Sequence, residues 1–221
     1  MTLVLLHSPL VGPLTWQAVA AHLPGAVAPD LSGAVTHASV AERVAARLEV
    51  DGPVVLVGHS GAGPLLPRIA RTVRQPVTAL IYVDSVLPHP GESWIQNAPA
   101  DLVDHLRGVA RDGVLPPWNE WFDPAALAEL LPDDEMRAAF VTELPRLPFS
   151  YFEEKASADT WDGPAGYLLL SEGYRDDAET ARKQGLAVAE HIDHHLAMLT
   201  SPATVAAALQ SLEPTARPIT R

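Results

Sequence analysis

The chain has 221 residues, of which 48% are hydrophobic and 19% are charged, a length that suits one domain with a substantial core. Its formal net charge of −12 at pH 7 disfavours nucleic acid or an anionic membrane surface as a partner. The absence of cysteine excludes disulfides, thiolate nucleophiles and cysteine-ligated metals. Since no apolar run is long enough to span a bilayer, we expect a cytoplasmic protein, a monomer or homodimer, that acts on a small molecule.

Short apolar runs alternate with amphipathic stretches along most of the chain. This alternation predicts the α/β class, with a mostly parallel sheet covered by helices on both faces. The apolar runs predict about six strands, at residues 3–6, 26–28, 54–57, 79–83, 167–170 and 187–192. The amphipathic stretches predict helices at residues 14–23, 40–50, 61–73, 176–184 and 202–212. We therefore assign residues 1–86 and 164–212 to one α/β core.

The segment of residues 87–163 interrupts this rhythm. It is rich in proline, acidic and aromatic residues, and boundary signals predict helices at residues 100–111, 124–131 and 133–143. We interpret it as a helical cap inserted between two strands, with Trp94, Trp118 and Trp121 as candidates to line an apolar substrate pocket. Alternatively, its aromatic side chains form a small core of the insertion itself. Residues 213–221, which include two prolines, are expected to form a flexible tail.

The most informative run is a predicted buried strand that leads into a turn of small residues and then a helix, Val54-Val55-Leu56-Val57-Gly58-His59-Ser60-Gly61-Ala62-Gly63. In a nucleophile elbow, a strained turn of this kind projects a serine hydroxyl above the sheet. Gly58 meets the need for small neighbours, whereas Ala62 replaces the usual second glycine. The N–H of Gly61 would face a developing oxyanion, and we assign the adjacent His59 to substrate contact. The alternative is a glycine-rich turn in which Ser60 only caps the helix.

Histidines near the C-terminus supply a candidate base for Ser60. They lie between the last predicted strand and the last predicted helix, where a general base belongs. His195 is the first choice, because apolar neighbours can anchor the loop while its ring faces the serine, and His194 is the alternative. A metal site and a solvated polar loop compete with this interpretation. We predict no metal, because the candidate ligands are adjacent residues at a strand end that point in different directions, His191, Asp193, His194 and His195.

Three segments together resemble the α/β-hydrolase family. Leu5-Leu6-His7-Ser8-Pro9, with Trp16, resembles the family's His-Gly segment and the tryptophan that follows it. Gly58-His59-Ser60-Gly61-Ala62-Gly63 resembles its nucleophile elbow, and His194-His195-Leu196-Ala197-Met198-Leu199-Thr200-Ser201-Pro202 resembles its C-terminal histidine motif. The resemblance covers nearly the whole chain except the insertion and implies the α/β-hydrolase fold. The first two strands of many members are missing, and the spacing is closest to the small esterase and hydroxynitrile lyase branch.

The resemblance also implies a carboxylate that orients the histidine, and here the chain departs from the usual pattern. Tyr174 stands at about the position of the usual acid, with Glu172 and Asp176 on either side. Another known location follows the preceding strand, as in haloalkane dehalogenases, and Asp84 occupies it. We rank Asp84 first, then Glu172, then Asp176, because a buried carboxylate at a strand end can stabilise an imidazolium. The alternative role of Asp84 is a structural hydrogen bond to the start of the insertion.

The oxyanion hole implied by the resemblance also departs from the family pattern. Relatives take a second donor from the residue after His-Gly, and Pro9, which has no N–H, stands there. Either Leu10 or Ser8 supplies this donor, or the hole, formed by Gly61 and the segment at Pro9 and Leu10, is incomplete. A missing donor typically costs about 10²–10³ in rate, which argues against an ordinary fast esterase.

These residues predict a serine hydrolase that cleaves an ester, thioester or lactone of a small, largely apolar substrate, without a metal or an organic cofactor. Ser60 would form an acyl-enzyme, His195 would act as general base, and Asp84 would orient the base. One alternative is a non-hydrolytic enzyme, a lyase or cyclase, that uses the same pair as a proton shuttle. Another is a catalytically weak relative that only binds its ligand.

A more remote alternative is an NAD(P)-dependent reductase. The glycines of Gly58-x-x-Gly61-x-Gly63 follow a predicted strand, and Tyr151 and Lys155 form a Tyr-x-x-x-Lys pair of the kind that short-chain reductases use. However, the glycine spacing differs from that of dinucleotide-binding loops, and the unit is not the first of the sheet. The Tyr–Lys pair also falls in the proline-rich insertion rather than on a long core helix.

Overall fold

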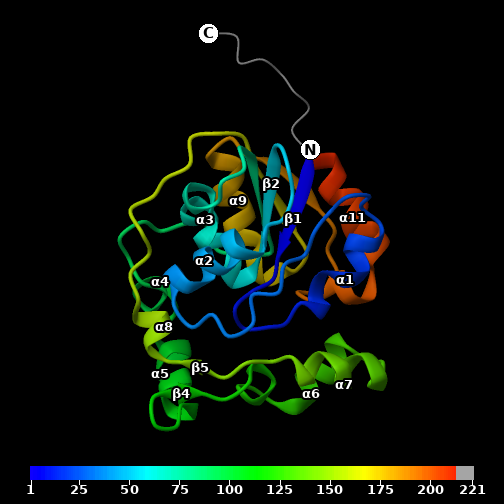
Figure 1. Cartoon of the computed structure of the whole chain (residues 1–221). Coiled ribbons are helices and arrows are strands. Elements are labelled where there is room, and N and C mark those ends of the chain that lie inside the picture. The colour runs from blue at the N-terminus through cyan, green and yellow to red at the C-terminus, as the bar shows by residue number, and fades with distance from the viewer. Residues whose placement is uncertain (213–221) are drawn as a thin grey trace.

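A central sheet of five parallel strands organises the computed structural model, which describes residues 1–212 (Figure 1). The strand order is β1-β2-β3-β6-β7, and every neighbouring pair is parallel. The strands are β1 (Thr2–Leu6), β2 (Val54–His59), β3 (Val77–Val83), β6 (Ala165–Leu169) and β7 (Ala187–Glu190). This confirms the predicted α/β class. The flexible tail expected at residues 213–221 lies outside the described residues.

The sheet has five strands rather than about six, because residues 26–28 do not form a full strand. Val27 makes a single parallel bridge to Val4. Its N–H donates to Leu3 O (2.9 Å), and its carbonyl accepts from Leu5 N (2.8 Å). Pro29 follows two residues later and has no N–H to continue the ladder. Residues 26–28 therefore pair with the edge strand β1 at one position but do not add a sixth strand to the sheet.

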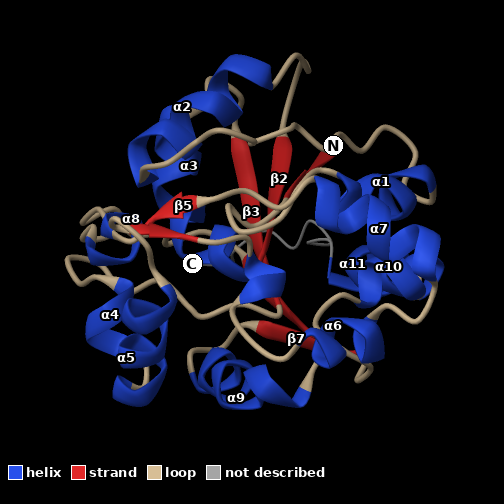
Figure 2. Cartoon of the chain, turned by 90° about the horizontal axis from the view of Figure 1, so that it is seen from below, coloured by secondary structure: helices blue, strands red, loops and turns tan. Residues whose placement is uncertain are grey.

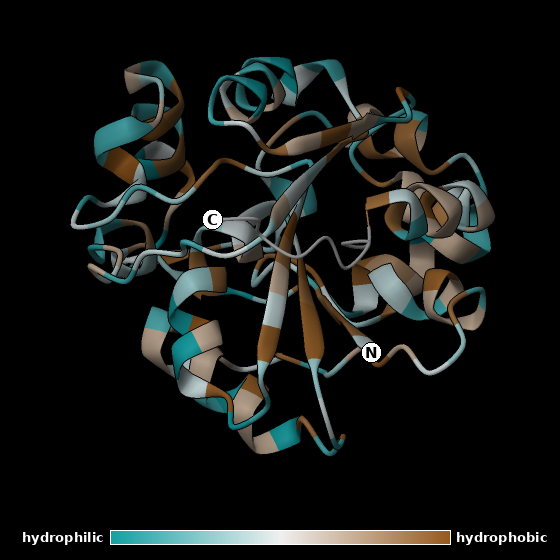
Figure 3. Ribbon diagram, turned by 90° about the horizontal axis from the view of Figure 1, so that it is seen from above, coloured by the Kyte–Doolittle hydropathy of each residue, from teal (hydrophilic) through white to brown (hydrophobic). Residues whose placement is uncertain are grey.

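Side chains of the strands alternate between two apolar layers. Leu6 and Leu56 pack on one face, beneath α2 (His37–Arg47), α3 (Leu66–Thr72) and α9 (Arg175–Lys183). Leu5 and Val57 pack on the other face, beneath α1 (Leu14–Ala21), α10 (Ala197–Thr200) and α11 (Pro202–Leu212). Figure 2 shows α2 and α3 on one side of the strands and α1, α10 and α11 on the other. In Figure 3 the central strands carry much of the strongly hydrophobic colouring. Burial on both faces explains why these strands are nearly continuous apolar runs.

Each of the five stretches predicted to be helical overlaps a helix of the core, with two differences at their starts, and the short helix α10 was not predicted. They are α1 (Leu14–Ala21), α2 (His37–Arg47), α3 (Leu66–Thr72), α9 (Arg175–Lys183), α10 (Ala197–Thr200) and α11 (Pro202–Leu212). Helix α2 begins three residues before the predicted start, because Thr36 caps it by accepting a hydrogen bond from Ser39 N. The helix predicted over residues 61–73 is divided into a 3-10 helix, η1 (Ser60–Leu65), followed by α3. Pro64 lies inside η1.

The insertion, residues 87–163, contains short helices and a two-stranded ribbon. Its elements are α4 (Trp94–Asn97), α5 (Ala100–Val109), β4 (Val114–Leu115), η2 (Trp118–Glu120), α6 (Pro124–Leu130), α7 (Asp134–Thr142), β5 (Leu147–Pro148) and α8 (Ser150–Glu153). Strands β4 and β5 are antiparallel. In Figure 1 most of these elements lie below the sheet, at the end where its strands finish. Within residues 1–212, every helix is too short or too polar to cross a membrane.

Candidate active site

Ser60 occupies a strained turn directly after β2. Its φ of 52° lies in the left-handed region, which is uncommon for a residue other than glycine. The surrounding turn is tightly packed. A Cβ at Gly58 would lie 2.9 Å from Leu66 Cδ2, and a Cβ at Gly63 would overlap Ser85 Oγ. The small residues of the motif are therefore required by close packing, and the turn presents Ser60 to a cavity that this residue lines.

A second strained turn follows the neighbouring strand β3, where Asp84 has a φ of 44°. The next residue, Ser85, ties the two turns together, because its hydroxyl donates to the carbonyl of Ser60 (2.7 Å). The hydroxyl of Tyr167, from β6, donates in turn to the carbonyl of Ser85 (2.8 Å). Two unfavourable backbone conformations are thus held in place by hydrogen bonds between adjacent strand ends.

Asp84 and His195 form the central polar contact of the site. Asp84 is fully buried, and its Oδ2 accepts a hydrogen bond from His195 Nδ1 (2.7 Å). The carboxylate also accepts from Leu170 N (2.8 Å), from Ser171 N (2.9 Å) and from the Ser171 hydroxyl (2.6 Å). These four hydrogen bonds compensate for the loss of water around the buried carboxylate. Because Nδ1 donates, Nε2 of the neutral His195 ring is left as the acceptor.

Two aromatic rings fix the position of the His195 ring. His59 lies at a ring-centroid distance of 4.5 Å, and Tyr174 stacks at 5.0 Å with an interplanar angle of 12°. Burial raises the pKa of Tyr174 to about 12, and an interaction with the Ser60 side chain opposes this shift only in part. The residue that replaces the usual acid therefore remains in the site as a protonated phenol. In the sequence, the number of residues between the predicted strand and Tyr174 had indicated that Tyr174 stands at the position of the usual acid.

His59 does not lie where it was expected. Its side chain is fully buried and does not line the cavity, so the assignment to substrate contact is wrong. Its Nε2 donates to the carbonyl of His195 (3.0 Å), and its ring packs edge-on against Trp16 at 6.1 Å. Burial holds the pKa of His59 well below its usual value. As the last residue of a strand whose side chains alternate between the two layers, His59 points into the core and supports the histidine loop.

The two other carboxylate candidates point away from His195. Glu172 and Asp176 are both exposed. Glu172 accepts from Arg175 at 2.5 and 2.6 Å, and this hydrogen bonding lowers its pKa. The short 3-10 turn η3 (Glu172–Tyr174) directs Tyr174, rather than either acid, toward the site. Of the three ranked carboxylates, the structure brings only Asp84 into contact with His195.

The predicted oxyanion segment lines the cavity through Gly61, Pro9 and Leu10. Gly61 lies in the first turn of η1, where backbone N–H groups have no partner within the helix. Pro9 has no N–H, and the N–H of Leu10 donates instead to Ser8 Oγ (3.2 Å). Ser8 Oγ is close enough to the turn that a Cβ at Gly61 would lie 3.0 Å from it. The donor that Pro9 lacks is thus not supplied by Leu10, because the N–H of Leu10 is already engaged.

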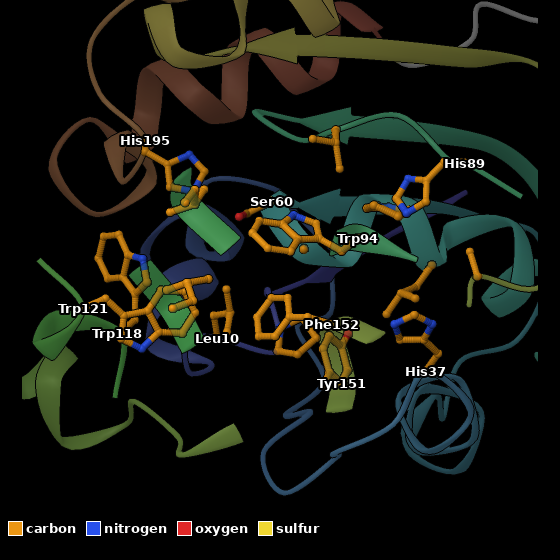
Figure 4. Close-up of a pocket in the computed structure, with 18 of the residues that line it drawn as sticks. Leu10, His37, Ser60, His89, Trp94, Trp118, Trp121, Tyr151, Phe152 and His195 are labelled. Carbon is orange, nitrogen blue, oxygen red and sulfur yellow. The ribbon is translucent and has the colours of Figure 1, made fainter. Parts of the chain in front are cut away.

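Aromatic side chains of the insertion close over a cavity of about 240 Å³ (Figure 4). Trp94, Trp118 and Trp121 all line it. Trp94 and Trp121 also pack edge-on against Phe152, at 5.0 and 6.0 Å. The two interpretations of these aromatics are therefore compatible, since the same rings form the small core of the insertion and the wall of the cavity. His37, His89 and Tyr151 also line it. No pattern in the sequence pointed to the two histidines, and Tyr151 was considered only as part of the pair with Lys155.

The features that suggested a metal site or a reductase do not come together. His194 is engaged locally, since its Nδ1 accepts from Leu196 N (3.2 Å) and its Nε2 contacts Thr200 Oγ1 (2.9 Å). Within residues 1–212, no group of three or more histidine, aspartate or glutamate residues could hold a metal ion. Lys155 is exposed and follows the end of α8, whereas Tyr151 is buried within it. The pair is thus not displayed along one helix.

Comparisons with known proteins agree with this architecture. The sequence profile of the Alpha/beta hydrolase family matches residues 3–208. An extracellular alpha/beta-hydrolase from a Paenibacillus species, which shares structural and functional homology with tobacco salicylic acid binding protein 2, has a TM-score of 0.77 at 18% identity, over 96% of this chain and 98% of its own. Polyneuridine aldehyde esterase has a TM-score of 0.70 at 17% identity, over 96% and 99% of the two chains.

A pyrethroid hydrolase from Sphingobium faniae JZ-2 has a TM-score of 0.68 at 18% identity, over 96% of each chain. No curated protein sequence matches the chain. At identities this low, the structural likeness concerns the fold, and the chemistry has to be argued from the site itself.

Proposed function

Since the chain belongs to the alpha/beta hydrolase family, we propose that it is a serine hydrolase that cleaves an ester, thioester or lactone of a small, largely apolar substrate. In this proposal Ser60 is the nucleophile, His195 is the general base and Asp84 orients the base. The observation that carries it is the 2.7 Å hydrogen bond from His195 Nδ1 to the buried Asp84, beside a cavity that both Ser60 and His195 line. No cofactor takes part in the proposed reaction.

The reaction follows from the donor and acceptor roles of these atoms. Ser60 Oγ attacks the carbonyl carbon while His195 Nε2 takes its proton, and Asp84 stabilises the imidazolium that forms. The imidazolium then protonates the leaving oxygen or sulfur, which departs and leaves an acyl group on Ser60. Water, deprotonated by His195, attacks this acyl group and releases the acid with the serine restored.

The oxyanion of each tetrahedral intermediate would be held by the N–H of Gly61 as the one backbone donor. Pro9 offers no donor, Leu10 N–H is engaged by Ser8 Oγ, and Ser8 itself is buried and does not line the cavity. We therefore propose an incomplete oxyanion hole and slow turnover, since one missing donor typically costs about 10²–10³ in rate. The apolar walls formed by Trp94 and Trp121 favour an apolar substrate, and residues 87–163 would act as a cap that excludes water.

A fluorophosphonate probe tests this proposal most directly. The wild type should be labelled on Ser60, whereas Ser60→Ala should not be labelled. Hydrolysis of p-nitrophenyl esters should fall by at least about 10³-fold in Ser60→Ala, as expected for loss of a nucleophile. A wild-type protein that resists the probe and hydrolyses no ester, thioester or lactone would refute the proposal.

A second candidate is favoured by the missing oxyanion donor. A lyase or cyclase could use Ser60 and His195 only to move a proton, without an acyl-enzyme and with less need for an oxyanion hole. In that case the probe would label Ser60, but no acyl-enzyme would accumulate from any activated ester. Mass spectrometry of the intact protein, quenched in acid during turnover, separates the two mechanisms, because only the hydrolase should show the added acyl mass.

A further inference from the structure

The side of the cavity opposite His195 carries polar atoms that lack a partner. In Figure 4, His195 lies beside Ser60 at one side, and His37 lies at the other with Tyr151 next to it. Both His37 and Tyr151 line the cavity, and each is only 7% exposed. His37 Nδ1 and the Tyr151 hydroxyl are buried and make no hydrogen bond within residues 1–212. Unpaired buried polar atoms are unfavourable, so they point to a missing partner.

Nearby protein groups do not supply this partner. The backbone N–H of His37, at the start of α2, donates to Glu154 Oε2 (2.9 Å). The other oxygen, Glu154 Oε1, lies 3.9 Å from His37 Nδ1, which is too far for a hydrogen bond. The Tyr151 ring packs edge-on against His37 at 4.9 Å and against Phe152 at 5.6 Å. Tyr151 is thus held between two rings at the wall of the cavity, and its hydroxyl has no protein partner among the described residues.

These two atoms also differ from the other unpaired ones. Four further buried side-chain atoms in the described part of the chain lack a partner, on Trp16, His59, Asn119 and His191. None of these four residues lines this cavity. Of the unpaired atoms in the described part of the chain, only those of His37 and Tyr151 thus belong to residues that line the cavity together with Ser60.

The two atoms form a donor and acceptor pair. Burial lowers the pKa of His37, so its ring is neutral and one nitrogen is an acceptor. In the tautomer that carries its proton on Nε2, Nδ1 is that acceptor. Burial raises the pKa of Tyr151, so its hydroxyl remains a donor.

The surrounding charges favour a neutral ligand group. Glu154 raises the pKa of His37, whereas Arg68 and His89 lower it, so charges of both signs surround this end. A carboxylate would lose its water on entry and would lie close to the like charge of Glu154, whose Oε1 is 3.9 Å from His37 Nδ1. A hydroxyl accepts one hydrogen bond and donates another, which matches the pair.

We propose that His37 and Tyr151 bind a hydroxyl group of the substrate, on the part of the molecule that points away from the scissile carbonyl. This inference rests on the proposed function for the reaction itself and narrows its substrate to hydroxylated esters, thioesters or lactones with an apolar body. Figure 4 places Trp94 and Phe152 between the two ends, where they would contact that body.

Matched pairs of esters test the proposal in both orientations of the substrate. One series pairs p-nitrophenyl alkanoates with their ω-hydroxy forms, over a range of chain lengths. The other pairs alkyl acetates with ω-hydroxyalkyl acetates. The measured quantity is the ratio of kcat/KM for the hydroxylated and the unsubstituted ester. In at least one series the wild type should prefer the hydroxylated ester by roughly tenfold, because the unsubstituted ester leaves the buried pair unsatisfied.

Variants at the two positions should remove this preference. Tyr151→Phe and His37→Leu should each bring the ratio below about twofold. His37→Asn, which keeps an acceptor near the place of Nδ1, should retain part of it. Tyr82→Phe is the matched control, because Tyr82 is a buried tyrosine that does not line this cavity, and it should keep the wild-type ratio. Circular dichroism and thermal unfolding would confirm that each variant is folded.

Two results would overturn the proposal. One is a wild type without preference in either series, which would mean that water alone satisfies the pair. The other is a Tyr151→Phe variant with the wild-type ratio. If no ester is hydrolysed at all, the proposed function fails, and calorimetry with the corresponding ketones, which cannot be hydrolysed, still decides this inference. The hydroxylated ketone should then bind roughly tenfold more tightly than the unsubstituted one, and equal binding would refute the hydroxyl site.

Discussion

The two ends of the cavity differ in how completely their polar atoms are already paired. At one end, the buried Asp84 accepts four hydrogen bonds, one of them from His195. At the other end, His37 Nδ1 and the Tyr151 hydroxyl are also sheltered from water but have no partner within residues 1–212. The first end is organised before any substrate arrives, whereas a ligand has to complete the second.

This difference follows from the elements that build each end. Ser60 and Asp84 follow neighbouring strands of the sheet, whose ladders and cross-strand hydrogen bonds fix the backbone. His37 begins α2 of the core, and Tyr151 belongs to α8 of the insertion. A rigid sheet edge suits chemistry that needs exact positions, and the junction between core and insertion suits the recognition of a substrate.

The largest expected effect is at the fully paired end. Asp84→Asn keeps the shape of the side chain, and asparagine tolerates the positive φ at this position. It should nevertheless lower kcat by roughly 10³–10⁴, because an amide nitrogen in place of Oδ2 cannot accept from His195 Nδ1–H, and the ring is then held in the wrong tautomer. Steady-state kinetics with a p-nitrophenyl ester measure this loss.

Glu172→Gln is the matched control for this variant. Glu172 is exposed, and within residues 1–212 its side chain forms hydrogen bonds only with Arg175. The kcat of the Glu172→Gln variant should therefore stay within about twofold of the wild type. Similar losses in both variants would contradict the assignment of the orienting carboxylate to Asp84.

A smaller effect, and in the opposite direction, is expected at the oxyanion segment. Pro9→Ala restores a backbone N–H at the edge of the cavity, where Leu10 N–H is already engaged by Ser8. If that N–H completes the oxyanion hole, kcat should rise by roughly tenfold, which is part of the 10²–10³ that one donor typically contributes. Pro13→Ala, at the N-cap of α1, controls for a general effect of losing a proline. A rate that stays the same or falls in Pro9→Ala would show that the hole is not limited by this donor.

The smallest expected effect concerns the pH dependence of stability. It compares His59, which is fully buried beside His195, with His37, which is slightly more exposed at the other end of the cavity. Burial lowers the pKa of His59 well below its ordinary value of 6.5 and lowers that of His37 as well. Below pH 6.5 the unfolded chain therefore binds protons that the folded chain does not, and the free energy of unfolding should fall as the pH drops from about 7 toward 5. Each such group contributes at most about 1.4 kcal/mol per pH unit.

Denaturant unfolding across this pH range measures the slope. His59→Gln keeps a donor near the place of Nε2 and should flatten the slope more than His37→Asn does, because His59 is fully buried. Equal slopes in the wild type and His59→Gln would mean that His59 takes up its proton in the folded state at an ordinary pH.

Several features could be predicted from local sequence alone. The alternation of apolar runs and amphipathic stretches identified the five strands and all core helices except α10, because burial on both faces requires continuous apolar strands. The turn of small residues around Ser60 was recognisable because close packing excludes a Cβ at Gly58 and Gly63. The sequence did not predict that residues 26–28 form a single bridge instead of a strand, because this depends on how the chain meets the edge of β1.

The sequence by itself determined the α/β class, the strained serine turn and a short set of acids and histidines at the ends of strands. Only the tertiary structure decided among them, since Asp84 and His195 are 111 residues apart and their contact depends on which strands become neighbours. The arrangement of distant segments also buried the side chain of His59 in the core and brought His37 and Tyr151 to one cavity. Local patterns record whether a side chain is buried, but what it meets there is decided by the packing of distant segments.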